Sequence, residues 1–303
     1  MSGTVAEAAA WLRRGGLVAF PTETVYGLGA DALNAAAVER IFAVKGRPKT
    51  SPLIVHADSA AMARELAREW PPEAEELARR YWPGPLTLVV RKHPRIPGVV
   101  TAGLDTVGLR VPAHPLAQEL IRVAGLPVAA PSANRFSQLS PTTAEHVRAS
   151  LGKDVDYILD GGPAAVGIES VVLSVAEKPA VLFRPGVIPA PELEEVAGPL
   201  RQPSGAGVGP DASPGMRPRH YRPATPLYLG HVPARGRGFR LLIQGAAEGA
   251  ALRMPAEPRG YAAILYAVLH SADRQGFDWI AVEMPPDTPA WAGVLDRLRR
   301  AAT

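Results

Sequence analysis

Residues 45–55, KGRPKTSPLIV, mark the place where a helical pattern gives way to a buried strand, and this boundary decides the fold class. The apolar positions of residues 35–44 repeat at helical spacing, whereas residues 53–56 form a short apolar run typical of a buried strand. Three cations, a glycine and a proline connect the two. Such a loop suits a bound polyphosphate, because Arg and Lys pair with phosphate and glycine leaves backbone N–H groups accessible. A solvated basic turn explains the same residues when they are taken alone.

Helical and strand patterns alternate on both sides of this boundary. Further helices are predicted at residues 4–14, 72–81, 115–124 and 143–151. Further strands are predicted at residues 17–20, 86–91, 107–111, 128–130, 157–159, 170–174 and 180–183. Thr4 and Glu7 have the spacing of a capping box at the start of the first helix. The alternation predicts an α/β fold with a twisted, mixed, open sheet covered by helices.

The composition of the chain changes near residue 200. Residues 199–226 are dense in Pro and Gly and have no helical or strand period, which indicates a linker. Beyond them, strands at 227–229, 239–243 and 279–282 and helices at 260–274 and 289–302 predict a small Rossmann-like α/β domain. We therefore predict a large domain over residues 1–198, a linker over 199–226 and a small domain over 227–303.

The linker carries a cluster of cations and aromatic rings, which are Arg217, Arg219, His220, Tyr221 and Arg222. Prolines on both sides limit the freedom of this backbone. Two interpretations stay open: a tether that is soluble because it is charged, or an active-site lid that closes over an anionic nucleotide.

Composition excludes several classes of mechanism. The chain has 303 residues, of which 47% are hydrophobic, a net charge of +4 and no cysteine. Disulfides, a thiolate nucleophile and cysteine-bound zinc are therefore excluded. The sequence also lacks the Walker motif GxxxxGK[ST], the GxSxG motif and the HExxH motif. No run approaches 18 apolar residues and the first residues lack the order of a signal peptide, so we expect a cytoplasmic protein that does not enter a membrane.

Two polar segments follow predicted strands. Residues 21–31, PTETVYGLGAD, and residues 131–134, PSAN, place hydroxyl, carboxylate and amide groups after apolar runs. Because open α/β sheets bind ligands beyond the carboxyl ends of their strands, these segments predict a site for a small polar ligand. Ordinary turns explain such residues when each is considered separately.

Seven motifs occur in a fixed order along the first part of the chain, namely PTETVYGLGAD, KGRPKTSPLIVH, WPGPLTLVV, VGLRVP, APSAN, GIESVV and FRPG. Together they resemble the YrdC-like threonylcarbamoyl-AMP synthases over roughly residues 5–190. HYRPATPL and the C-terminal helical segments resemble the linker and second domain of the longer, two-domain members of that family.

The resemblance implies an enzyme, a nucleotidyltransferase, that makes L-threonylcarbamoyl-adenylate and pyrophosphate from L-threonine, bicarbonate or CO2, and ATP. It implies Mg²⁺ bound to the ATP through phosphate oxygens and water, with no metal site built from protein ligands. The product serves threonylcarbamoyladenosine modification of tRNA next to the anticodon. The resemblance therefore also implies tRNA threonylcarbamoyl-transfer proteins as downstream partners, with a weak tRNA contact left open.

The resemblance also implies site residues. Lys45 and Arg47 are expected as catalytic residues that hold the phosphates of ATP. L-Threonine is expected at Thr24, His56, Arg110, Ser170 and the main chain of Ala130, with the Arg110 guanidinium on its carboxylate. ATP is expected at Lys45, Arg47, Ser51, Thr106, Ser132, Ser140, Arg184 and Tyr221, the last of these as a cover from the linker.

Three other functions are compatible with parts of the sequence. A double-stranded RNA or tRNA binding module without turnover is disfavoured by the modest net charge and by the lack of aromatic residues interleaved with basic ones. A carbamoyl-adenylate enzyme like the hydrogenase-maturation carbamoyltransferases would carry cysteine-rich zinc modules, which a chain without cysteine cannot form. A regulatory or nucleotide-sensing role stays open for the C-terminal unit.

Overall fold

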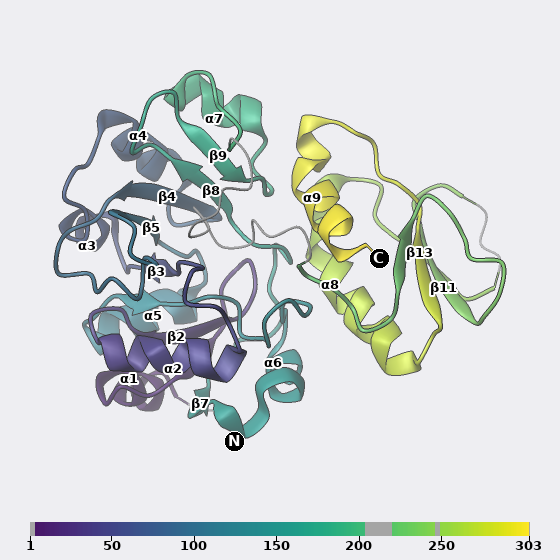
Figure 1. Ribbon diagram of the computed structural model, residues 1–303, viewed down its shortest axis with the longest axis horizontal. Helices are drawn as coiled ribbons and strands as arrows, with labels where there is room; N and C mark the ends of the chain where they lie inside the picture. The colour runs from purple at the N-terminus through teal and green to yellow at the C-terminus, as the bar shows by residue number, and fades with distance from the viewer. Residues whose placement is uncertain (1–3, 204–219, 246–248, 303) are drawn as a thin grey trace.

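The computed structural model describes residues 4–203, 220–245 and 249–302. Figure 1 shows a large part, coloured purple to teal, beside a smaller part in green and yellow, with α8 and α9 between their two sheets. The helices are α1 (Val5–Arg13), α2 (Ala35–Lys45), α3 (Ala60–Glu65), α4 (Pro72–Tyr81), α5 (Pro115–Ala124), α6 (Ala144–Leu151), η1 (Gly152–Asp154), α7 (Ala190–Ala197), α8 (Pro258–Gln275), η2 (Pro289–Trp291) and α9 (Ala292–Ala301). The strands are β1 (Val18–Phe20), β2 (Gly27–Asp31), β3 (Ile54–His56), β4 (Leu86–Arg91), β5 (Thr106–Arg110), β6 (Val128–Ala129), β7 (Tyr157–Ile158), β8 (Val171–Ser174), β9 (Val181–Arg184), β10 (Leu227–Leu229), β11 (Gly238–Leu242), β12 (Ala251–Arg253) and β13 (Trp279–Val282).

The large part is built on a nine-stranded sheet in the order β7-β1-β2-β6-β3-β5-β4-β8-β9. Three neighbouring pairs, β1 with β7, β3 with β5 and β4 with β8, are parallel, and the other five pairs are antiparallel. The order is open at β7 and at β9. The predicted α/β fold with a mixed, open sheet is confirmed.

The helix-to-strand boundary near residue 45 begins with a common type of helix C-terminus. Helix α2 ends at Lys45, and Gly46 takes the left-handed conformation with φ 62°, which glycine adopts without steric cost. The capping box at the start of α1 is also present, since Thr4 accepts from the Glu7 N–H and the Glu7 side chain accepts in return. Local sequence signals therefore placed these helix ends correctly.

Strand β2 was not expected, because its sequence GLGAD reads as a glycine-rich turn. A Cβ at Gly29 would lie 2.7 Å from the Val128 Cγ1 and 2.8 Å from the Phe20 ring. Because Gly29 has no side chain, Phe20 of β1 and Val128 of β6 can occupy the space beside it. Helices α3 and α7 and strand β12 were also missed; each is short, and short elements carry a weak local pattern.

The smaller part has a four-stranded, all-parallel sheet in the order β10-β13-β11-β12. Its apolar core continues into the large part, because Val25, Ile168 and Tyr221 belong to the same buried cluster as Tyr261 and Leu295. The two parts are therefore packed through a shared core. Among the described residues, no helix has the length and apolar character needed to cross a membrane.

Candidate active site

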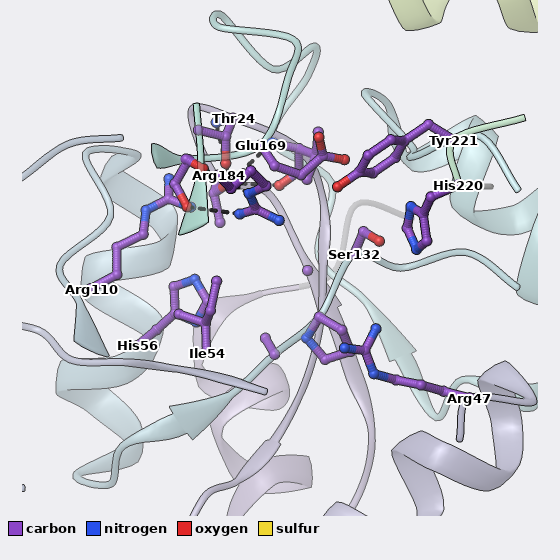
Figure 2. A pocket seen from close by; sticks show the side chains of 16 residues that line it. Thr24, Arg47, Ile54, His56, Arg110, Ser132, Glu169, Arg184, His220 and Tyr221 are labelled. Carbon is purple, nitrogen blue, oxygen red and sulfur yellow. Dashed lines mark hydrogen bonds between the residues drawn. The ribbon is translucent and has the colours of Figure 1, made fainter. Parts of the chain in front are cut away.

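A cavity of about 540 Å³, its open mouth included, lies at the ends of several strands of the large sheet (Figure 2). His56, Arg110 and Arg184 end strands β3, β5 and β9 there, at the edge where open α/β sheets bind ligands. The lining residues are Thr22, Thr24, Val25, Gly27, Arg47, Ile54, His56, Arg110, Ala130, Pro131, Ser132, Glu169, Ser170, Arg184, His220 and Tyr221. Segments that are far apart in sequence thus converge on one polar pocket.

Arg110 is fixed at one side of the pocket by two hydrogen bonds. Its Nη2 donates to the Glu23 Oε1 at 2.7 Å, and its Nε donates to the Gly84 carbonyl oxygen at 3.1 Å. The second Glu23 oxygen accepts from the Ala113 N–H at 3.0 Å. Both side chains are buried, so the guanidinium is held in one orientation by a carboxylate that our site prediction did not include. Glu23 lies in the PTETVYG motif, which could have pointed to it.

Hydroxyl groups and a neutral imidazole surround Arg110. The Thr22 and Thr24 hydroxyls lie 2.9 Å apart, and the Ser170 hydroxyl lies 2.8 Å from that of Thr87. Burial, and then the charge of Arg110, lower the pKa of His56 to about 3. Its buried Nδ1 has no hydrogen-bond partner among the described residues, and an unpaired buried polar atom at a pocket wall is suited to a polar ligand.

Two more guanidinium groups reach the pocket. The Arg47 Nη2 donates to the Ser51 Oγ at 2.7 Å and to the Pro52 carbonyl oxygen at 2.9 Å. The Arg184 Nε donates to the Ser170 carbonyl oxygen at 2.9 Å. Arginines that are oriented in this way present a planar set of donors, which matches phosphate.

Lys45 is buried beside the cavity but is not one of its lining residues. Its Nζ donates to the carbonyl oxygens of Ser132 and Asn134 at 2.6 and 2.5 Å, so it anchors the PSAN loop from behind. Burial, followed by the charges of Arg47 and Arg135, holds the Lys45 pKa well below its ordinary value. The lysine therefore holds the main chain at Ser132, which lines the pocket, and its predicted role at the phosphates of ATP stays a prediction.

Glu169 is the one carboxylate among the described lining residues, and it was not among the predicted site residues. It accepts from the Ser140 Oγ at 2.5 Å, the Tyr266 hydroxyl at 3.1 Å and the Arg297 Nε at 2.8 Å. Burial alone would raise the Glu169 pKa, but the charges of Arg297 and Arg184 and the hydrogen bond from Ser140 lower it to about 2. Two of these partners, Tyr266 and Arg297, come from the C-terminal helices, which no local motif reveals.

His220 and Tyr221 form the wall on the linker side, where Figure 2 shows them together. Tyr221 has φ 62°, a left-handed conformation that is unfavourable for a large side chain. Burial lowers the His220 pKa to about 3; the positive charges of Arg47, Lys45 and Arg184 also lower it. Arg217 and Arg219 of the predicted cluster lie outside the described residues.

The structure brings most of the predicted site residues to this pocket: Thr24, Arg47, His56, Arg110, Ala130, Ser132, Ser170, Arg184 and Tyr221. Lys45, Ser51 and Ser140 lie directly behind it, bonded to Ser132, Arg47 and Glu169 respectively. Thr106 lies in a second, small cavity that shares Ile54 with the first. The ligand assignments of these residues stay predictions.

The sequence matches one family model over residues 10–186, the Sua5/YciO/YrdC model, which is described as "Telomere recombination". The chain belongs to the Sua5/YciO/YrdC family. Residues 188–303 match a second model, Sua5_C, described as "Threonylcarbamoyl-AMP synthase, C-terminal domain". The two matches together confirm the predicted resemblance to the longer, two-domain type.

Individual members of the Sua5/YciO/YrdC family match nearly the whole chain. The threonylcarbamoyl-AMP synthase of Pyrococcus abyssi is 42% identical over 315 residues, which are 97% of this chain and 93% of the relative. The threonylcarbamoyl-AMP synthase of Bacillus subtilis is 42% identical over 320 residues, which are 98% of this chain and 92% of the relative. The crystal structure of P. abyssi Sua5 complexed with L-threonine superposes with a TM-score of 0.91 and 39% identity, and covers 98% of this chain and 94% of that one.

Proposed function

We propose that this chain is an L-threonylcarbamoyladenylate synthase, a nucleotidyltransferase that joins L-threonine, bicarbonate or CO2, and ATP and releases pyrophosphate. The observation that carries the proposal is that one pocket has Arg110 on one side and Arg47 on the opposite side (Figure 2). One cation suits a carboxylate and the other suits a polyphosphate. The names of the relatives and the L-threonine in the P. abyssi structure support the same function.

The threonine would lie at the Arg110 side. Its carboxylate would accept from the guanidinium, whose plane is already set by Glu23 and Gly84. Its hydroxyl and amine would face the neutral His56, Thr24, Ser170 and the main chain of Ala130. Because His56 and the hydroxyls are buried, they favour a ligand that satisfies their hydrogen bonds and reject one that leaves them unpaired.

The ATP would lie at the side of Arg47 and Arg184, with Ser132 beside its phosphates. The small second cavity is lined mostly by apolar side chains, among them Val89, Leu104 and Val172, and also by Thr106. Such a slot suits a flat adenine ring, with the Thr106 hydroxyl as a polar contact. Tyr221 points into the main pocket (Figure 2) and would cover the nucleotide from the linker.

The reaction needs positioning and charge neutralisation more than a protein nucleophile. The threonine amine would attack CO2 and lose a proton, or attack bicarbonate with loss of water; either route gives a carbamate. A carbamate oxygen would then attack the α-phosphorus of ATP as the bond to the β-phosphate oxygen breaks, and pyrophosphate would leave. Arg47 and Arg184 would hold the phosphates in line, while Arg110 fixes the attacking group from the other end.

Mg²⁺ is proposed as the companion of the ATP, since it neutralises phosphate charge and orients the leaving pyrophosphate. Among the described residues there is no group of three or more His, Cys, Asp or Glu that could hold a metal ion. The carboxylate that lines the pocket, Glu169, is already paired with Arg297. Phosphate oxygens and water are therefore the ligands that fit this site.

We further propose the domain boundaries 1–198, 199–226 and 227–303, supported by the two separate sheets, and a lid role for the linker. Only residues 199–203 and 220–226 of that linker are described. His220 and Tyr221, which line the pocket, support the lid. Transfer proteins that deliver the product to tRNA, a weak tRNA contact and a cytoplasmic location belong to the same proposal.

Product analysis by mass spectrometry tests the function. The purified full chain is incubated with ATP, Mg²⁺, L-threonine and isotope-labelled bicarbonate. We expect an adenylate that carries both the threonine mass and the isotope label, together with pyrophosphate. Retention of double-stranded RNA or tRNA without any adenylate would contradict the proposal and favour an RNA-binding module.

A further inference from the structure

Two C-terminal helices send side chains to the wall of the pocket. Arg297 of α9 donates through Nε to the Glu169 Oε2 at 2.8 Å and through Nη2 to the Glu169 carbonyl oxygen at 3.1 Å. Tyr266 of α8 donates to the same carboxylate at 3.1 Å, and a ring nitrogen of His270 lies 3.1 Å from the Ser140 carbonyl oxygen. The smaller part of the molecule therefore contributes directly to a site whose lining comes from the larger part and the linker.

Arg297 is the centre of these contacts and was not selected from the sequence. It is 1% exposed. Its Nη1 donates to the Pro185 carbonyl oxygen and to Asp296, both at 2.9 Å. Its guanidinium carbon lies 5.3 Å from the centre of the Tyr221 ring. A buried arginine with carboxylate partners is costly to desolvate, and apolar residues of similar volume often stabilise such a position equally well, so stability alone is a weak reason for it.

The position of Glu169 supplies a reason for the arginine. Glu169 lines the pocket together with Arg184, on the side that we assign to the triphosphate. A carboxylate there would repel ATP and would attract Arg184 away from Ser170. The charged and titratable groups near it are Arg297 from α9, Tyr266 from α8, Arg184 from β9, and His220, Tyr221, Lys45 and Arg47 at or near the pocket. Arg297 forms an ion pair with Glu169 at 2.8 Å, and it does not line the cavity.

We propose that Arg297 is a positioning residue of the pocket: it neutralises Glu169 from outside the cavity and packs against Tyr221, so that the wall formed by Glu169, Arg184 and Tyr221 can face a triphosphate. The inference rests on the proposed function, because it takes ATP as the ligand at this wall. It gives the C-terminal domain a definite task, which is to provide the counter-charge for a carboxylate inside the pocket.

The first test is Arg297→Met in the full chain, with Arg299→Met as the matched control. Arg299 lies on the same helix, and its ion pair with Asp287, at 3.2 Å, is exposed. A non-hydrolysable ATP analogue and L-threonine are titrated separately at mildly alkaline pH, and thermal unfolding is recorded. We expect the ATP analogue to bind at least about tenfold more weakly to Arg297→Met, because the Glu169 carboxylate is then unpaired and repels the triphosphate. The affinity for threonine should stay within about twofold of the original. Equal ATP affinity in Arg297→Met and Arg299→Met would overturn the inference.

Glu169→Gln and the double variant Glu169→Gln/Arg297→Met separate charge from folding. Removal of the carboxylate alone should tighten binding of the ATP analogue, whereas Arg297→Met should weaken it. Removal of both charges should return the affinity to within about threefold of the original, because neutral pairs of similar volume are tolerated in buried sites. Weaker ATP binding in Glu169→Gln, or no recovery in the double variant, would contradict the inference even if Arg297→Met does not fold. Failure of the unaltered chain to bind the analogue would instead overturn the proposed function.

Discussion

Arg110→Ala is the substitution that most directly tests the threonine side of the pocket. The guanidinium makes two hydrogen bonds to the protein, at 2.7 and 3.1 Å, so it is oriented before the ligand arrives. A hydrogen bond to a charged group contributes about 1.5–3 kcal/mol. Loss of the contact to the threonine carboxylate should therefore raise the KM for threonine about 10- to 100-fold, while the KM for ATP changes little.

The same substitution also affects folding, and this effect must be separated from binding. Arg110 is the counter-ion of Glu23, and both are buried. Removal of one partner of a buried ion pair costs about 3–5 kcal/mol of unfolding free energy. The double variant Glu23→Gln/Arg110→Met leaves no unpaired charge, so it should recover much of the lost thermal stability without recovering the affinity for threonine.

Initial rates of pyrophosphate release, measured against threonine at saturating ATP, provide the assay, with thermal unfolding of each variant recorded in parallel. An unchanged threonine KM in both variants would refute the assignment of Arg110. A KM that recovers together with stability in the double variant would show that Arg110 acts through Glu23 and the fold instead of through the ligand.

Three further predictions concern the phosphate side, pH and the first helix. Arg47→Ala should raise the KM for ATP about tenfold or more with little change for threonine; an unchanged value in the same rate assay would exclude Arg47 from the nucleotide site. Because the folded-state pKa values of His56, His146 and His220 lie near 3, 4 and 3, the unfolded chain takes up protons first as pH falls below about 6.5. Thermal stability should then decrease steadily from neutral pH toward pH 4, and a flat profile would contradict this. Thr4→Ala should cost about 1 kcal/mol in chemical denaturation through loss of the helix cap, so an unchanged midpoint would argue against the capping box.

Local patterns were sufficient for much of the fold. Capping by Thr4, the glycine that ends α2 and the apolar runs at β4 and β13 all act over a few residues, so their elements could be placed from the sequence. Strand β2 could not, because Gly29 is required by the side chains of Phe20 and Val128. A turn and a closely packed strand share the same glycine-rich sequence, and only the tertiary contact distinguishes them.

The site shows the same division between motif and geometry. Ordered motifs led to Arg47, Arg110 and Arg184, all of which line one pocket. They could not show that Lys45 donates to the carbonyl oxygens of Ser132 and Asn134, since side-chain direction depends on the surrounding packing. The pairing of Glu169 with Arg297 joins residues 128 positions apart, which no local pattern can indicate.

The measurement that tests the central claim most directly is pyrophosphate release by the full chain when one substrate at a time is omitted. The account predicts release only when ATP, L-threonine and bicarbonate are all present, because the carbamate must form before the α-phosphorus is attacked. Release at the same rate without threonine or without bicarbonate would contradict it, as would the absence of release from a folded chain supplied with all three substrates and Mg²⁺.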